Sequence, residues 1–67
     1  MTMIKIQPVK PEHKGYDTGY FCICNGSIAS YNASFGWMDR PEMTAERLER
    51  HVKQMTEDGF RVTIEEF

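Results

Sequence analysis

The sequence predicts an α+β fold, a small and mostly antiparallel sheet with one amphipathic helix packed on one face. Two observations predict it. β-Prone runs flank Asn25-Gly26, which indicates a hairpin. A later segment carries apolar residues at helical spacing and is followed by one more alternating run. The expected order is β-β-β-α-β, and residues 1–67 form a single domain.

The first strand is expected over residues 3–7, where side chains alternate and Ile4 and Ile6 point inward. Residues 8–18 contain prolines and a glycine, which predicts a loop. His13 lies in this loop and is expected to be exposed. The partner of the first strand, and the strand order, stay open at this point.

The hairpin spans residues 20–37, and its register decides which side chains face the helix. A two-residue turn at Asn25-Gly26 would pair Ile23 with Ile28 and place apolar residues on both faces. A three-residue loop over residues 24–26 separates the side chains more cleanly, so we expect that register. One face then holds Phe21, Ile23, Ala29, Tyr31, Ala33, Phe35 and Trp37, and the other holds Tyr20, Cys22, Ile28, Ser30, Asn32 and Ser34.

The helix is expected within residues 39–60, with Thr44 as its N-cap and a capped turn at residues 39–42 as an alternative start. Gly59 suits the left-handed position that follows a helix. The last strand is expected over residues 60–65. The core-facing residues of these two elements are Ala45, Leu48, Val52, Met55, Phe60, Val62 and Ile64.

Composition excludes several classes of protein. The formal net charge of -2 predicts no general attraction to nucleic acid or to anionic membranes. No run approaches the ~20 apolar residues of a membrane span, and residues 1–9 lack the apolar core of a signal peptide. Cys22 and Cys24 stand too far apart on one strand for easy bridging, so free thiols and a cytoplasmic location are expected. The initiator Met and the short length favour a complete small protein.

Motifs for catalysis or cofactor binding are absent, so we expect neither enzyme activity nor a cofactor. Cys22 and Cys24 could bind a metal together with His13 or His51, but zinc sites usually show two ligand pairs at characteristic spacings. Small strand residues are the simpler interpretation of both cysteines.

A basic strip on the helix could contact nucleic acid. It consists of Arg47, Arg50, His51 and Lys53. Acidic residues are interleaved with it, namely Glu46, Glu49, Glu57 and Asp58. A phosphate-binding footprint is usually clustered and net basic, so a solvated helix face is favoured and direct nucleic-acid binding is not expected.

Surface aromatic residues on the second hairpin face, in the loop and at the C-terminus are the remaining feature, and aromatic residues are enriched in binding hot spots. The candidate partner-binding residues are Tyr16, Tyr20, Ile28, Asn32, Glu65, Glu66 and Phe67. If no second layer covers that face, it is a contact surface or the seam of a homodimer; the alternative is an ordinary sheet back face. Trp37 either plugs the end of the core or anchors an interface.

The layout of strands, capped helix and a last strand with Gly59, Phe60, Val62 and Thr63 resembles small phage-encoded inhibitors. These include compact α/β anti-CRISPR proteins and a small phage inhibitor of bacterial RNA polymerase. The resemblance covers layout over most of the chain and carries over no residue roles. It implies an inhibitor in the host cytoplasm that blocks a surface of a larger host protein or nucleoprotein complex. The alternative is a small metal- or nucleic-acid-binding domain that uses the cysteines or the helix basic residues.

Overall fold

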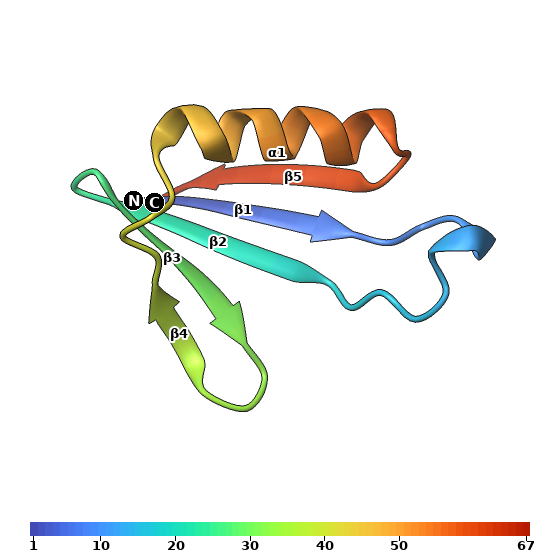
Figure 1. Ribbon diagram of the computed structural model, residues 1–67, viewed down its shortest axis with the longest axis horizontal. Helices are drawn as coiled ribbons and strands as arrows, with labels where there is room; N and C mark the ends of the chain where they lie inside the picture. The colour runs from blue at the N-terminus through green and yellow to red at the C-terminus, as the bar shows by residue number, and fades with distance from the viewer.

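One five-stranded sheet and one helix make up the protein, as a computed structural model of residues 1–67 shows (Figure 1). The elements are β1 (Thr2–Gln7), the 3-10 turn η1 (Pro11–His13), β2 (Gly19–Cys24), β3 (Ser27–Asn32), β4 (Gly36–Asp39), α1 (Ala45–Glu57) and β5 (Arg61–Glu66). The strand order is β4-β3-β2-β1-β5, and every neighbouring pair is antiparallel. The predicted α+β class is confirmed, and the structure adds the short strand β4.

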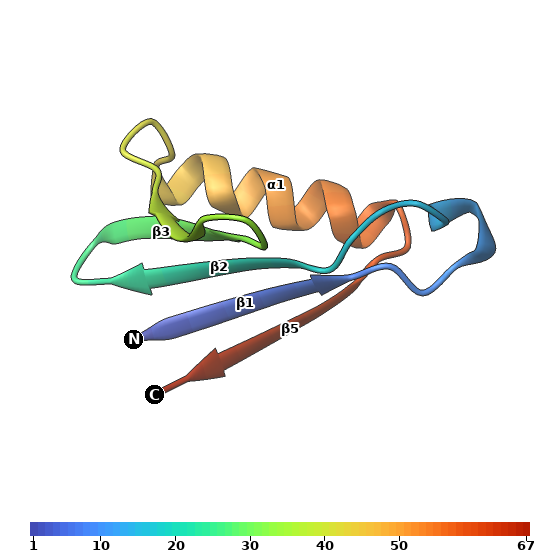
Figure 2. The ribbon, with the colours of Figure 1, turned by 90° about the horizontal axis from the view of Figure 1, so that it is seen from below.

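The first strand lies inside the sheet, between β2 and the last strand. Both chain ends therefore meet at one corner of the molecule (Figure 2). The Phe67 amide donates to the Met1 carbonyl at 2.8 Å, and the Met1 amino group donates to the Phe67 carbonyl at 3.1 Å. These bonds extend the β1–β5 ladder to the final residue.

The β2–β3 hairpin has a different register from the one predicted. Ile23 pairs with Ile28, so the loop contains only two residues. Asn25 has φ 51° and Gly26 has φ 82°, and positive φ at both central residues defines the type I′ turn that matches strand twist. The predicted three-residue loop is wrong because the local turn preference of Asn-Gly outweighs the separation of apolar from polar side chains. The β3 side chains consequently lie on the opposite faces from those predicted, so Ile28 is in the core, whereas Phe21 and Ile23 keep their predicted place on the core face.

A second hairpin joins β3 to β4 and projects away from the helix (Figure 1). Asn32 builds its turn, because the side-chain Oδ1 accepts from the Ser34 amide at 2.8 Å and from the Phe35 amide at 3.2 Å. Phe35 lies at this turn with 77% of its surface exposed. The expected place of Phe35 on the core face is therefore wrong, and so is that of Trp37, which pairs with Tyr31 and is 46% exposed.

The helix ends are capped as predicted. The Thr44 side chain accepts a hydrogen bond from the Arg47 amide at 3.2 Å. At the other end, the Phe60 amide donates to the Met55 carbonyl at 3.0 Å, and the Gly59 amide donates to Thr56 at 3.1 Å. These two bonds form a Schellman motif, which requires the positive φ of 90° at Gly59.

The core lies between α1 and one face of the sheet. Five residues form its buried centre: Ile4, Ile6, Ile28, Leu48 and Phe60. Six partly buried residues pack against it: Phe21, Ile23, Met43, Val52, Met55 and Val62. The predicted inward residues of the first strand and of the helix centre are confirmed, whereas Ala45 and Ile64 are exposed.

The long loop is tied to the helix end by His13, which is buried and not exposed as predicted. Its ring stacks on Phe60 with 3.8 Å between centroids. Nε2 lies 3.0 Å from the Asp58 carbonyl, which can only accept, so Nε2 carries the hydrogen. Tyr16 covers the pair, with its ring edge-to-face against Phe60 at 5.5 Å.

Candidate partner-binding surface

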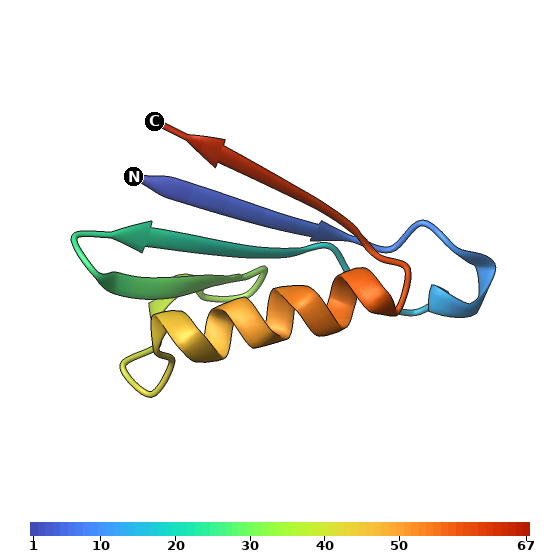
Figure 3. The same cartoon turned by 90° about the horizontal axis from the view of Figure 1, so that it is seen from above.

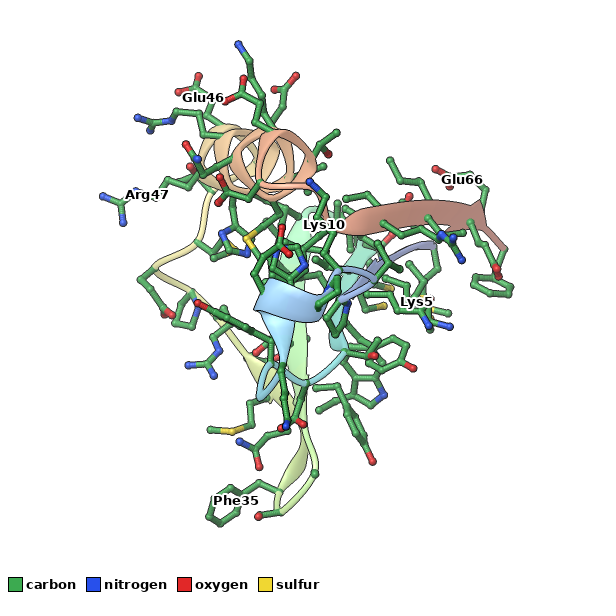
Figure 4. The ribbon with its side chains drawn as sticks, turned by 90° about the vertical axis from the view of Figure 1, so that its right-hand side faces the viewer. Lys5, Lys10, Phe35, Glu46, Arg47 and Glu66 are labelled. Atoms are coloured by element: carbon green, nitrogen blue, oxygen red, sulfur yellow. The ribbon has the colours of Figure 1, made fainter.

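No other element covers the face of the sheet opposite the helix; we call it the open face (Figures 3 and 4). Lys5 projects from this side, while Glu46 and Arg47 point outward from the helix on the other side (Figure 4). Cross-strand pairing assigns two rows of side chains to the open face. One row is Asp39, Ala29, Cys22, Met3 and Glu65, and the next is Trp37, Tyr31, Tyr20, Lys5 and Thr63.

Three aromatic side chains stand side by side in the second row. Tyr20 and Tyr31 meet edge-to-face with 6.1 Å between centroids, and Tyr31 and Trp37 do so at 5.5 Å. Met3 joins them, and the four side chains line a shallow hollow of about 350 Å³ with no polar residue. Tyr31 is 47% exposed and Trp37 is 46% exposed. The open face thus presents a continuous apolar patch to solvent, which we call the aromatic cluster.

Charged groups surround the aromatic cluster without neutralising one another. Lys5 lies beside Tyr20 in the same row, and Asp39 and Glu65 end the neighbouring row on opposite edges of the sheet. The chain has one salt bridge, between Arg40 and Glu42 at 4.0 Å on another part of the surface. The charges on the open face are therefore free to meet charges on a partner.

The structure separates the residues that the sequence grouped as a contact surface. Tyr20 and Glu65 lie on the open face. Ile28 is in the core on the opposite face, so its assignment to a surface beside Tyr20 is wrong. The reason is the hairpin register, since a shift by one residue moves a side chain to the other face.

Three of the other predicted residues lie elsewhere. Asn32 holds the β3–β4 turn, and Tyr16 packs over the helix end. Glu66 lies on the helix side, where both carboxylate oxygens are 2.8 Å from the Thr2 hydroxyl. Phe67 is exposed at the corner where the chain ends meet, and the β1–β5 ladder places it on the same side of the sheet as Glu65.

Sequence reasoning missed the centre of the open face. The predicted register places Tyr31 and Trp37 on the core face, with an interface anchor as the alternative for Trp37, and the sequence indicates no contact role for Met3 or Lys5. One signal could have found them. A two-residue Asn-Gly turn makes residues whose numbers sum to 51 face each other, which places Tyr20 opposite Tyr31.

The two alternative sites have little support in the structure. Cys22 is half-buried and Cys24 is exposed, both as free thiols, and no three metal-ligating side chains gather anywhere in the chain. On the helix, Arg50 and Lys53 alternate with Glu46 and Glu49 around one shallow depression. That mixture of charges differs from the clustered basic surface that binds phosphate.

The chain was compared with protein families, curated proteins and solved structures. No protein-family model, no curated protein and no solved structure matches this chain. The single helix is too short and too polar to cross a bilayer. What the protein does is therefore inferred from its own surfaces.

Proposed function

We propose that the protein is a non-catalytic binding module that covers a surface of a larger protein or protein–nucleic acid complex and so inhibits it. The observation that carries the proposal is the aromatic cluster on the open face. Half-exposed Tyr and Trp side chains on a rigid sheet offer large apolar area at low cost in side-chain entropy. Binding would complete the layer that the sheet lacks on this side.

The chemistry of the open face suggests what the partner presents. Its centre should be flat and apolar, because the hollow lined by Met3 and the three aromatic rings is shallow and contains no polar residue. Its rim should be basic where it meets Asp39 and Glu65, which bracket the face and lack a partner in the chain. Such charges contribute mainly to association rate and orientation.

A single-stranded nucleic acid is the competing partner. Three aromatic rings beside Lys5 on a sheet favour it, because bases stack on such platforms. Two observations favour protein instead. The rings are inclined to one another at 87° and 67°, so they do not form one flat stacking surface. The acidic residues at both ends of the neighbouring row would repel phosphates.

The test is affinity capture from lysate of the source cells or their host, read by mass spectrometry, with variants that separate the face from general apolar exposure. Trp37→Ser and Tyr31→Ser remove rings from the aromatic cluster. Phe35→Ser is the matched control, because Phe35 is the most exposed aromatic residue but lies at a turn outside the cluster.

The proposal expects one protein or complex that the wild type and the Phe35 variant capture in equal amount and that both cluster variants lose. Thiol labelling then locates the contact, since bound partner should protect Cys22 from a maleimide. Equal capture by all four chains would overturn the proposal. So would recovery of nucleic acid alone, lost as salt rises.

A further inference from the structure

The outer edge of β5 is an unpaired strand edge, and no element lies beyond it in either view of the sheet (Figures 2 and 3). Met1 and Phe67 exchange both of their hydrogen bonds, which fixes the alternation along the β1–β5 ladder. The backbone N–H and C=O groups of Thr63 therefore point to β1. Those of Val62 and Ile64 point outward to solvent and have no partner within the chain.

An apolar groove runs beside this edge on the helix side. Ile64 is 58% exposed although its strand neighbour Ile4 is in the core. The groove measures about 260 Å³, and six of the seven residues that line it are apolar: Ile4, Ile23, Ala45, Leu48, Val52 and Ile64, with Glu49 as the seventh. A strand added to β5 would cover Ile64 and part of this groove.

We infer that the occupant is a second copy of this chain, paired antiparallel through β5 with Thr63 on the two-fold axis. Outward-pointing residues must face each other, so Val62 pairs with Ile64 of the second copy. The same register places Arg61 opposite Glu65 of the second copy, on the open-face side of the sheet. Both pairs occur twice because the interface is symmetric.

The charges and side chains of β5 favour this register over its neighbours. This register pairs Arg61 with Glu65, Val62 with Ile64, and Thr63 with Thr63. Opposite-charge, apolar and Thr–Thr pairs are the cross-strand pairs that stabilise sheets. Arg61 and Glu65 have no salt-bridge partner within the chain, so both are free for it. Shifting the axis to Ile64 would place Val62 opposite Glu66 and Arg61 opposite Phe67, so the two opposite-charge pairs are lost and a single Ile64–Ile64 pair replaces two apolar pairs.

The dimer would join two five-stranded sheets edge to edge. Both helices would lie on one side and both open faces on the other, so the aromatic clusters would remain uncovered. This inference does not depend on the proposed function; in the dimer Arg61 of the second copy engages Glu65, which leaves Asp39 as the acidic group that meets a partner's basic rim. The dimer is measured on the purified chain alone, whereas the proposed function is tested by capture of a partner.

The first test measures dimerisation of the purified chain by sedimentation equilibrium and compares wild type with variants in which the charges at residues 61 and 65 are reversed. Wild type should dimerise reversibly with concentration. Arg61→Glu and Glu65→Arg should each weaken dimerisation by about tenfold, because each creates two like-charge pairs. The double variant Arg61→Glu/Glu65→Arg should restore it. A monomeric wild type at the highest attainable concentration, or single variants that dimerise as wild type does, would overturn the inference.

The second test fixes the register in a Cys22→Ser/Cys24→Ser background. Thr63→Cys should form an intermolecular disulfide on mild oxidation, because residues opposite each other at non-hydrogen-bonded positions have Cα atoms about 4.5 Å apart. Glu65→Cys is the matched control and should not crosslink, since its counterpart lies four residues away, ~13 Å along the strand. Equal crosslinking of both variants would overturn the register. Circular dichroism of each variant confirms that it is folded.

Discussion

The two faces of the sheet are made by the same strands and hold different kinds of side chain. The covered face carries aliphatic residues such as Ile4 and Ile28, which are buried against the helix. The open face carries Tyr31 and Trp37, which make edge-to-face contacts and keep nearly half of their surface in solvent. Stability should therefore depend on the first face, and recognition on the second.

The largest expected loss of stability is at Leu48 on the covered face, and Trp37 on the open face is its comparison. Leu48 is 2% exposed, so Leu48→Ala should cost about 3 kcal/mol through lost burial and a residual cavity. That is a large share of the stability of a chain this size, ~3–10 kcal/mol. Trp37→Ala should cost ~1 kcal/mol, the contribution of an aromatic pair. Urea unfolding followed by circular dichroism measures both. Equal losses would remove the distinction between the faces.

Two adjacent residues of β3 test the assignment of faces directly. Ile28→Ala should destabilise the protein by ~2–3 kcal/mol because Ile28 is buried in the core. Ala29→Ser should change stability by less than about 0.5 kcal/mol, because Ala29 lies on the open face. Urea unfolding followed by circular dichroism measures the stability of both variants. A larger loss of stability for Ala29→Ser than for Ile28→Ala would favour the three-residue loop, in which the β3 side chains lie on the opposite faces.

The turn that fixes the register should give a smaller effect. Gly26→Ala places a Cβ at φ 82° and should cost about 1–2 kcal/mol. Gly19→Ala is the control, since Gly19 lacks positive φ and no atom stands within 4 Å of a Cβ added there. Thermal unfolding measures the stability of the Gly26→Ala and Gly19→Ala variants. A harmless Gly26→Ala would mean that the turn does not select the register.

The smallest expected effect concerns the helix that covers one face. Thr44→Ala removes the N-cap acceptor of the Arg47 amide and should cost ~1 kcal/mol. Thr44→Ser keeps the hydroxyl and should restore most of that loss. Thermal unfolding detects the difference. Partner capture by both variants should match wild type, because the cap lies on the covered side of the sheet.

Elements with local signals could be predicted from the sequence. Thr44 and Gly59 mark the helix ends through short-range hydrogen bonds, and the alternation around Ile4 identifies the first strand. The burial of His13 could not be predicted in the same way. It depends on Phe60 and on the Asp58 carbonyl, which are 45 or more residues away along the chain and come close only after folding.

The candidate surface was only partly predictable because both faces of the hairpin hold large side chains. Tyr31 and Ile28 both suit a buried position, so periodicity alone could support either register. Backbone chemistry at Asn25 and Gly26 decides between them. The sequence predicts Tyr20 and Glu65 on a contact surface, but the predicted register places the rings of Tyr31 and Trp37, which complete that surface, on the core face.

The position of β1 between β2 and β5 has a consequence for the order of folding. The β2–β3 hairpin closes over two residues, whereas the β1–β5 ladder joins opposite ends of the chain and requires the largest loop closure. The hairpin should therefore form early and the ladder late. In a circular permutant, a short linker would join Phe67 to Met1, and new ends would open between Ala33 and Phe35. The β1–β5 pairing would then become a local hairpin, and the β3–β4 pairing would join opposite ends of the chain in its place, so β4 should become the last strand to join the sheet.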